Sequence, residues 1–552
     1  MPTLEWIGKD KVVNHHLDVP YRVLDFKYSY NENGVSDQES SSDNKIIKGD
    51  NLEALKALLP QYEGRINCIY IDPPYNTGNE KWVYNDNVND PKIKKWLGEV
   101  VGKEGEDLSR HDKWLSMMYP RLKLLHKLLA DDGAIFISIN YIEQAYLKLI
   151  CNEIFGANNF ISEVAIVNNP KGRSDDNYIA TAHESLLIYR KSKNLELGGF
   201  LPEEKVTKRY NKLEEESGRK YREIDLRKTG DEDLREDRPD MFYPFFYNEV
   251  TKDLKVGSLD EKLPDGYMSI LPMKSKTVEG RWRWGVDTAK RDIKKLLARY
   301  MPVKKQWSVF EKDYLDEKEL VKPTSAWTFK DVNSERGTEM FTKHLGFKKS
   351  DFPNPKPVGT IERVLQIATD KNSIVLDSYA GSGTTAQAVL NLNNKDKGNR
   401  KFILVELEDY AETVTTERVN RVINGHKDFQ GVGGNYNFYH LGQPLLLENK
   451  FINENIDIQK IREYIFFTET KKQITVVDDK DNKYLLGEHN DSLYYFYYEK
   501  DKTTSLSYDF LSKINKSAER YIIYADVNLL SKSECDKLNI VFKKIPRDIA
   551  RL

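Results

Sequence analysis

The sequence predicts an α/β protein built around one doubly wound, mostly parallel sheet. Two observations lead to this fold class. Short apolar runs of strand length recur along the chain, and two of them end in turns with the composition of ligand-binding loops: residues 65–71 (RINCIYI) precede DPPYNTG, and residues 373–376 (SIVL) precede DSYAGSGTT. Because open α/β sheets bind ligands at the carboxyl ends of their strands, we expect both turns to lie at one sheet edge.

The sheet is predicted to assemble from two separate parts of the chain. Residues 46–190 and residues 351–440 carry its strands, which we expect at residues 65–71, 134–138, 185–189, 373–376 and 401–405.

The remaining segments are predicted to lie outside this sheet. Residues 1–45 read as an N-terminal arm that ends in a polar tract. Residues 191–350 are too long for a loop and predict a separate lobe, whose charged part at residues 203–240 is expected to be helical. Residues 441–552 predict a small C-terminal α/β domain.

The glycine-rich turn has the features of a nucleoside-binding βαβ unit. Gly381 and Gly383 allow the backbone to approach a ligand closely, and Asp377 ends the strand before them. About twenty residues farther on, a second strand ends in Glu406, whose carboxylate can bind both hydroxyls of a ribose. A turn of this kind can also be a simple strand-to-helix connection, so this motif alone is weak.

The DPPY turn has the features of a clamp for an amino-bearing base. Asp72 and the Pro73 carbonyl can accept the two hydrogens of an exocyclic amino group, which draws its nitrogen toward tetrahedral geometry and makes the lone pair nucleophilic. Pro74 makes the turn rigid, and Tyr75 offers a ring on which a base can stack. The alternative is a structural diproline turn. The glycine-rich turn elsewhere in the chain favours the clamp.

At these residues the chain resembles the amino-methylating (N4/N6) DNA methyltransferases of the beta group, in which the catalytic motif precedes the cofactor motif. Within that group it is most similar to modification subunits of type III restriction-modification systems. The resemblance implies a Rossmann-like S-adenosylmethionine-dependent fold with an inserted target-recognition domain. It also implies cofactor contacts by Asp50, Asp72, Lys356, Pro357, Val358, Asp377, Tyr379, Ala380, Gly381, Gly383, Thr384 and Glu406. Tyr379 stands where the family usually has Phe.

The activity implied by the resemblance is methyl transfer from S-adenosyl-L-methionine to N6 of a flipped-out adenine in double-stranded DNA, without a metal. The Asp at the head of the clamp favours adenine over cytosine N4. A homodimer and a helicase–nuclease restriction subunit are the implied partners. We expect a cytoplasmic bacterial or archaeal protein that joins the nucleoid through DNA.

Three alternatives stay open from the sequence. A solitary methyltransferase without a nuclease would look the same. A protein-glutamine or RNA methyltransferase would typically have Asn at the head of the clamp. A catalytically silent DNA-binding specificity subunit would need a damaged motif, whereas both motifs are intact. The sequence contains no GxxxxGK[ST] motif, so we expect cleavage to require another polypeptide.

Composition favours an intracellular enzyme. The 552 residues allow two to four domains, and no apolar run approaches the length of a membrane span. Cys68, Cys151 and Cys535 are scattered singly, which predicts neither disulfides nor a metal cluster.

DNA binding requires an uneven charge distribution, because the net charge of the chain is only -2. Residues 266–310 contain eleven basic and three acidic side chains, with Trp282 and Trp284 interleaved. We predict a DNA-binding face there, represented by Arg281, Arg283, Lys294 and Lys295. For residues 289–299, an ordinary solvated helix face is an equally good interpretation.

Two further segments are predicted to border the base. Asn76, Thr77 and Gly78 start a loop expected to close over it, with Trp82 and Tyr84 as candidate aromatics. His183 and Glu184 precede an apolar strand and fit a pocket wall or a structural cap equally well.

Overall fold

The computed structural model describes residues 3–76, 110–173, 176–200, 208–315, 320–447, 451–474, 483–546 and 549. The chain forms two compact units. The larger contains Met1–Gly198 and Pro323–Leu552, and the smaller contains Gly199–Lys322.

The larger unit is built on an eleven-stranded mixed sheet, so the predicted α/β fold class is confirmed. In the series β5, β4, β16, β17, β3 and β20, each strand pairs in parallel with the next. Strand β7 pairs antiparallel with β5 and β6, and β1 pairs antiparallel with β20. In spatial order the strands are β15 (Ala326–Trp327), β6 (Phe160–Ile166), β7 (Glu184–Arg190), β5 (Leu129–Ile139), β4 (Ile66–Ile71), β16 (Ile374–Asp377), β17 (Lys401–Glu406), β3 (Lys45–Lys48), β20 (Asn435–Pro444), β1 (Arg22–Asn31) and β2 (Gly34–Ser36).

The order of strands reverses between β4 and β16. From β4 the chain proceeds to β5 on one side, and from β16 it proceeds to β17 on the other. The two strands pair in parallel through Val375 with Cys68 and Leu376 with Ile69. Their carboxyl ends, which carry the two predicted turns, therefore meet at a topological switch point, where sheets of this kind bind ligands.

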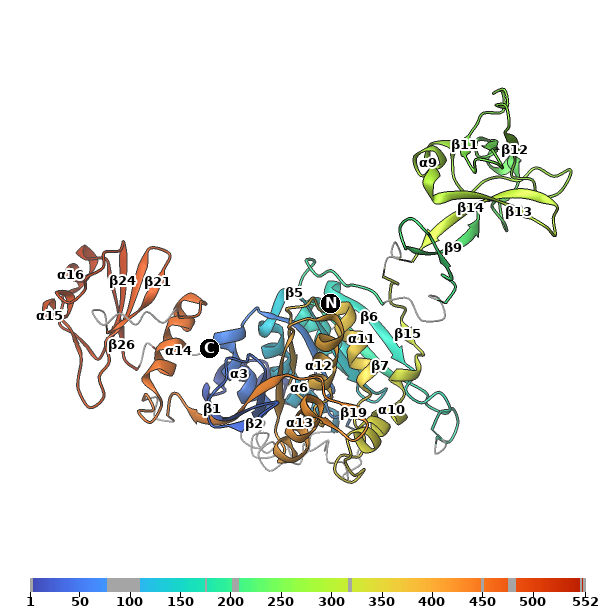
Figure 1. The fold of residues 1–552 in the computed structure, drawn as a ribbon. Coiled ribbons are helices and arrows are strands. Elements are labelled where there is room, and N and C mark those ends of the chain that lie inside the picture. The colour runs from blue at the N-terminus through green and yellow to red at the C-terminus, as the bar shows by residue number, and fades with distance from the viewer. Residues whose placement is uncertain are drawn as a thin grey trace. The chain divides into compact units, whose positions relative to one another are not determined.

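Helices cover both faces of this sheet (Figure 1). On one face lie α3 (Asn51–Tyr62), α6 (Arg110–Leu128) and α7 (Gln144–Cys151). Their apolar side chains pack with alternate strand residues such as Ile69, Ile135 and Ile403, which are fully buried. On the other face lie α11 (Val358–Ala368), α12 (Thr384–Asp396) and α13 (Thr416–Asn424), which contact one another and the sheet.

The prediction that residues 1–45 form an N-terminal arm outside the sheet is wrong. Strand β1 lies inside the sheet, paired with β20 from Arg22 opposite Pro444 to Asn31 opposite Asn435. The polar tract is fixed as well, because the side chain of Asn437 bonds to Ser40 and to the carbonyl of Ser42. Pairing partners some 400 residues away cannot be inferred from local composition.

The smaller unit, Gly199–Lys322, contains fewer residues than the predicted lobe, residues 191–350. Residues beyond Lys322 return to the larger unit, because β15 pairs with β6 and α10 (Ser334–Glu339) follows it. The smaller unit has two antiparallel sheets. In the first sheet the strands lie in the order β13 (Leu296–Met301), β14 (Gln306–Tyr314), β9 (Lys220–Asp225) and β8 (Lys212–Leu213). In the second sheet the order is β11 (Leu254–Val256), β10 (Phe245–Tyr247) and β12 (Met268–Ile270).

Two helix predictions for this lobe are wrong. Within the described part of residues 203–240 there are two strands and short 3₁₀ turns instead of a helix. Helix α9 (Val286–Arg291) is short and is followed by a 3₁₀ turn at Ile293–Lys295 and then by β13, whose pairing with β14 outweighs the helical spacing of the lysines and leucines.

Residues after β20 form a further group of helices and strands within the larger unit. Helix α14 (Ile458–Thr470) packs against the N-terminal region, with the Tyr464 ring 4.5 Å from that of Tyr21. A four-stranded sheet follows, in the order β21 (Leu485–His489), β22 (Ser492–Phe496), β24 (Arg520–Ala525) and β26 (Ile540–Lys544).

Candidate functional site

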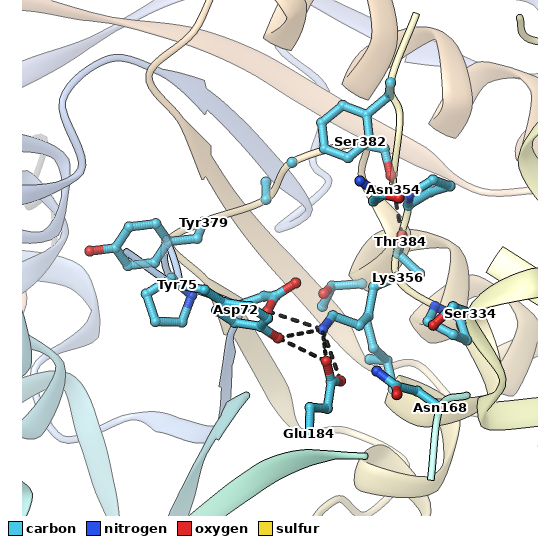
Figure 2. A pocket seen from close by; sticks show the side chains of 18 of the residues that line it. Asp72, Tyr75, Asn168, Glu184, Ser334, Asn354, Lys356, Tyr379, Ser382 and Thr384 are labelled. Carbon is cyan, nitrogen blue, oxygen red and sulfur yellow. Dashed lines mark hydrogen bonds and ion pairs between the residues drawn. The ribbon is translucent and has the colours of Figure 1, made fainter. Parts of the chain in front are cut away.

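The two turns line one cavity of about 490 Å³ at the switch point, a volume typical of small-molecule sites. The clamp residues Asp72, Pro73, Pro74 and Tyr75 form part of its wall, and residues of the glycine-rich turn form another part (Figure 2). The remaining wall comes from α10, from the segment before α11 and the first turn of that helix, and from Tyr70, Asn140, Asn168, Arg173 and Glu184. All of these residues belong to the larger unit.

The clamp is held rigidly from behind. The indole Nε1 of Trp114 donates a hydrogen bond of 2.7 Å to the Pro74 carbonyl, and this tryptophan is fully buried in α6. Asn76 adopts a left-handed φ of 55° and donates to Glu143, which also bonds to His111 at 2.7 Å. These contacts fix the carboxyl-terminal side of the diproline turn, so Tyr75 is preorganised on the cavity side.

An ammonium group lies among the acidic groups of the clamp (Figure 2). Lys356 Nζ is 3.1 Å from Asp72 Oδ1 and 2.9 Å from Glu184 Oε1. It also donates to the Tyr75 hydroxyl at 2.8 Å, and that hydroxyl donates to Glu184 Oε2 at 3.0 Å. Four side chains from three separate segments therefore share one polar cluster.

Burial and charge act in opposite directions on this cluster. Burial raises the pKa of Asp72, the Lys356 ammonium opposes that rise, and the Glu184 carboxylate adds to it. Burial alone would lower the pKa of Lys356, but the carboxylates of Asp72 and Glu184 outweigh it and raise that pKa. The lysine is therefore charged at neutral pH.

The glycine-rich turn is shaped by buried carboxylates. Asp377 accepts from the Tyr379 amide at 3.0 Å and from the Thr385 hydroxyl at 2.5 Å. Glu406 accepts from the Gly381 amide at 2.8 Å and from the amides of the two residues that follow it. Burial raises the pKa of Asp377 and that of Glu406 to about 7 in each case.

Gly383 is needed for a reason other than the expected one. Its φ is +82°, and a Cβ there would lie 3.1 Å from the Thr415 carbonyl oxygen. A side chain there would thus be crowded by the protein behind the turn, whereas the sequence predicts that this glycine allows close approach to a ligand. Gly381 is also left-handed, with a φ of 52°, and it lines the cavity.

The predicted cofactor residues divide into two groups. Those on the cavity wall are Asp72, Lys356, Pro357, Asp377, Tyr379, Ala380, Gly381 and Thr384. Asp50, Val358, Gly383 and Glu406 lie behind it, so their direct contact with a cofactor stays a prediction. Asp50 caps the amino end of α3 by accepting from the Leu52 amide at 2.8 Å and forms an ion pair with Arg121.

Several residues at or behind the cavity wall were not predicted from the sequence. Ser334 and Thr338 of α10 line the cavity, and a Cβ on Gly337 would lie 2.2 Å from the Pro355 carbonyl oxygen, so glycine allows the helix to approach. Arg418 is fully buried and donates at 2.7 Å to the hydroxyls of Ser382 and Thr384. Burial lowers the pKa of Arg418 to about 9. An arginine inside a helical pattern gives no hint of such a role.

The predicted DNA-contacting residues of the smaller unit differ in exposure. Arg281 is buried, and its Nε donates to the Glu232 carbonyl at 2.5 Å, so its prediction as a phosphate contact is wrong. Trp282 beside it is a core residue that donates to the Tyr243 carbonyl. Arg283 and Lys294 are exposed, and Lys295 is half-buried. The basic and aromatic alternation thus marks an irregular segment whose Trp282 packs into the core of the smaller unit.

Some predicted features fall outside the described residues, namely Thr77, Gly78, Trp82 and Tyr84. Among the residues that are described, no group of three His, Cys, Asp or Glu side chains could hold a metal ion. Within the same part of the chain, no helix has both the length and the apolar character to cross a membrane.

The sequence is similar to those of known DNA methylases. The sequence profile of a family described as DNA methylase matches residues 66–417. The type II methyltransferase M.KpnI from Klebsiella pneumoniae is 37% identical over 66% of this chain and 81% of its own length. The EcoPI Mod subunit of a type III restriction-modification enzyme from Escherichia phage P1 is 34% identical over 74% of this chain and 64% of its own length.

Other likenesses are more distant. The EcoP15I Mod subunit from Escherichia coli is 31% identical, again over 74% of this chain and 64% of its own length. The chain therefore spans under two thirds of these two type III relatives. A solved structure, the M1.HpyAVI-SAM complex, is 16% identical over 68% of this chain and 98% of its own, with a TM-score of 0.30. The family match, which covers both turns and the cavity between them, shows that this chain belongs to the DNA methylase family.

Proposed function

We propose that this protein is a site-specific DNA methyltransferase that transfers a methyl group from S-adenosylmethionine to N6 of an adenine in double-stranded DNA. The observation that carries the proposal is that the amino clamp and the glycine-rich turn line one cavity. A methyl donor held by one wall would therefore lie beside an amino acceptor held by the other, and positioning of this kind supplies much of the catalysis.

The glycine-rich wall has the groups that this donor requires. Glu406 and Asp377 are buried carboxylates at the turn, and Glu406 is the group we expect at the ribose hydroxyls. The hydroxyl of Thr384, backed by the Arg418 guanidinium, suits the carboxylate of the methionine end. When bound, the donor supplies an activated methyl group on a positively charged sulfur.

The clamp wall has the groups that an amino acceptor requires. Asp72 Oδ1 is buried and takes no hydrogen bond within the described residues, although Lys356 is beside it. It can therefore accept a hydrogen from the amino group, with the Pro73 carbonyl accepting the other. The Tyr75 ring is tethered through its hydroxyl and provides a surface for the extruded base.

The biological setting is proposed from the resemblance. We infer a modification subunit of a type III-like restriction-modification system, with a solitary methyltransferase as the alternative. We also infer a homodimer in which one subunit reads the site while its partner methylates, a separate helicase–nuclease restriction subunit, and a location with DNA in the cytoplasm. A monomer that methylates at the full rate would contradict the dimer.

Substrate class is tested with the purified chain and methyl-labelled S-adenosylmethionine. Duplex DNA, RNA and total protein are offered separately, each also with Asp72→Ala as the blank. The proposal expects label in DNA alone. Label in RNA or protein at a comparable rate would replace it with one of the alternative substrate classes.

Changes at Tyr75 should separate stacking from tethering. Tyr75→Ala removes the ring and should reduce single-turnover methylation by about tenfold to a hundredfold, since a stacked base contributes about 1–3 kcal/mol. Tyr75→Phe keeps the ring and loses only the hydroxyl bonds to Glu184 and Lys356, so its loss should be smaller. Equal losses in the two variants would show that stacking is not the role of this ring.

Basic residues of the smaller unit should govern the salt dependence of DNA binding. Lys290, Lys294, Lys304 and Lys305 are all exposed, and replacing them together by Ala should reduce the slope of log affinity against log salt by about 0.9 for each lost contact. Arg281→Ala is the control, because this buried residue should affect stability and leave the slope unchanged. An unaltered slope in the quadruple variant would place the DNA face elsewhere.

A further inference from the structure

The clamp contains one more acidic group and one more basic group than the transfer itself requires. Asp72 and Tyr75 follow β4, Glu184 begins β7, and Lys356 precedes α11, so three segments bring these groups together. The side chains of Lys356 and Glu184 are 13% and 8% exposed. Placing two charges in a buried site has a cost in desolvation, so the pair calls for an explanation.

We propose that Lys356 and Glu184 take part in the function of the base clamp by positioning its groups and balancing its charge. In this proposal Lys356 is a positioning residue that keeps Asp72 ionised and Tyr75 in place, and Glu184 balances the charge of Lys356. The proposal rests on the function proposed above. It differs from the family resemblance, which implies that Lys356 contacts the cofactor.

The hydrogen-bond geometry supports this division of roles. The Lys356 ammonium donates to Glu184 at 2.9 Å and to the Tyr75 hydroxyl at 2.8 Å. Toward Asp72 it forms an ion pair, in which Nζ lies 3.1 Å from Oδ1. The lysine thus stabilises the negative charge of Asp72 while leaving that oxygen able to accept from a substrate amino group.

The charges also balance through the transfer. Glu184 and Lys356 cancel, so Asp72 leaves the site with one net negative charge toward the sulfonium. During transfer the carbon–sulfur bond breaks, its electron pair stays on sulfur, and the amino nitrogen forms the new bond to carbon. The nitrogen then loses one proton, which Asp72 accepts. Sulfur and Asp72 both end neutral, and the Glu184–Lys356 pair is unchanged.

The groups that face Asp72 determine the expected pH behaviour. They are Lys356, Glu184 and Tyr75 in the cluster, Tyr70 on β4, and Asp377 at the end of β16. Lys356 is the cation among them. Removing its charge should make ionisation of Asp72 harder, and removing the charge of Glu184 should make it easier. The two changes should therefore act in opposite directions.

Thermal unfolding of the cofactor-free protein tests the cluster without any activity. In Lys356→Met the folded-state pKa of Asp72 rises further above its unfolded value, and the stability that such a group contributes is present at low pH and lost as the pH rises. Its Tm should fall relative to the wild type as the pH rises above the ordinary pKa of an Asp side chain, about 4. Glu184→Gln should show the reverse trend, and Lys356→Arg should follow the wild type.

Single-turnover methylation of duplex DNA against pH gives the second readout. The acidic limb should move to higher pH in Lys356→Met and to lower pH in Glu184→Gln, each by about one pH unit or more. Shifts in the same direction, or slower rates with no shift, would overturn the proposal, as would identical thermal profiles for Lys356→Met and Lys356→Arg. If even the wild type transfers no methyl group, the proposed function fails, and the thermal profiles still decide the cluster.

Discussion

Asp72→Ala should reduce methyl transfer by about a thousandfold or more, the largest effect expected of any single change in this protein. The variant loses the carboxylate that we propose accepts a hydrogen bond from the target amino group and takes up its proton. The fold should survive, because Asp72 Oδ1 accepts no hydrogen bond within the described residues and the loss leaves Lys356 and Glu184 as a neutral pair.

Three measurements distinguish this prediction from general damage. Transfer is measured under single-turnover conditions, cofactor affinity by calorimetry, and Tm by scanning calorimetry. Asp132→Ala is the matched control, since this exposed carboxylate on β5 is not among the residues that line the cavity. Activity of Asp72→Ala within about tenfold of the wild type would show that Asp72 is not the amino acceptor.

Glu406→Ala should weaken S-adenosylmethionine binding by about a hundredfold. Its carboxylate accepts from the amides of Gly381, Leu407 and Glu408, at 2.8, 2.9 and 3.2 Å. Each donor left unsatisfied costs about 1–3 kcal/mol, so the turn should rearrange even before the loss of a ribose contact is counted.

Controls separate this local effect from global unfolding. Glu412→Ala removes an exposed glutamate that pairs with Lys48, and it should bind the cofactor normally. Gly383→Asp should weaken cofactor binding through strain, because its Cβ would press on Thr415 at a left-handed φ. Unchanged affinity in both Glu406→Ala and Gly383→Asp would place the cofactor elsewhere.

Local patterns were sufficient to predict the sheet near the site. The apolar runs before Asp72 and Asp377 form β4 and most of β16. Both aspartates line the same cavity, as expected. These strands are buried on both faces, so their residues are almost all apolar, and such a continuous apolar run can be recognised directly in the sequence.

What the sequence did not reveal depends on contacts between distant segments. Strand β1 finds its partner β20 more than 400 residues later, and Lys356 meets Glu184 across 172 residues. The smaller unit shows the same limit, because the buried Arg281 lies beside the exposed Arg283 in one basic motif. Only the fold determines which of these charges faces solvent.

The most direct test is the nucleoside and sequence analysis of DNA from cells that express this chain alone, beside cells that express Asp72→Ala. We predict N6-methyladenine at one recognition sequence in the first DNA and none above background in the second. N4-methylcytosine in its place would contradict the choice of adenine. The absence of any modified base from DNA that the folded, cofactor-binding chain had contacted would contradict the proposed methyl transfer itself.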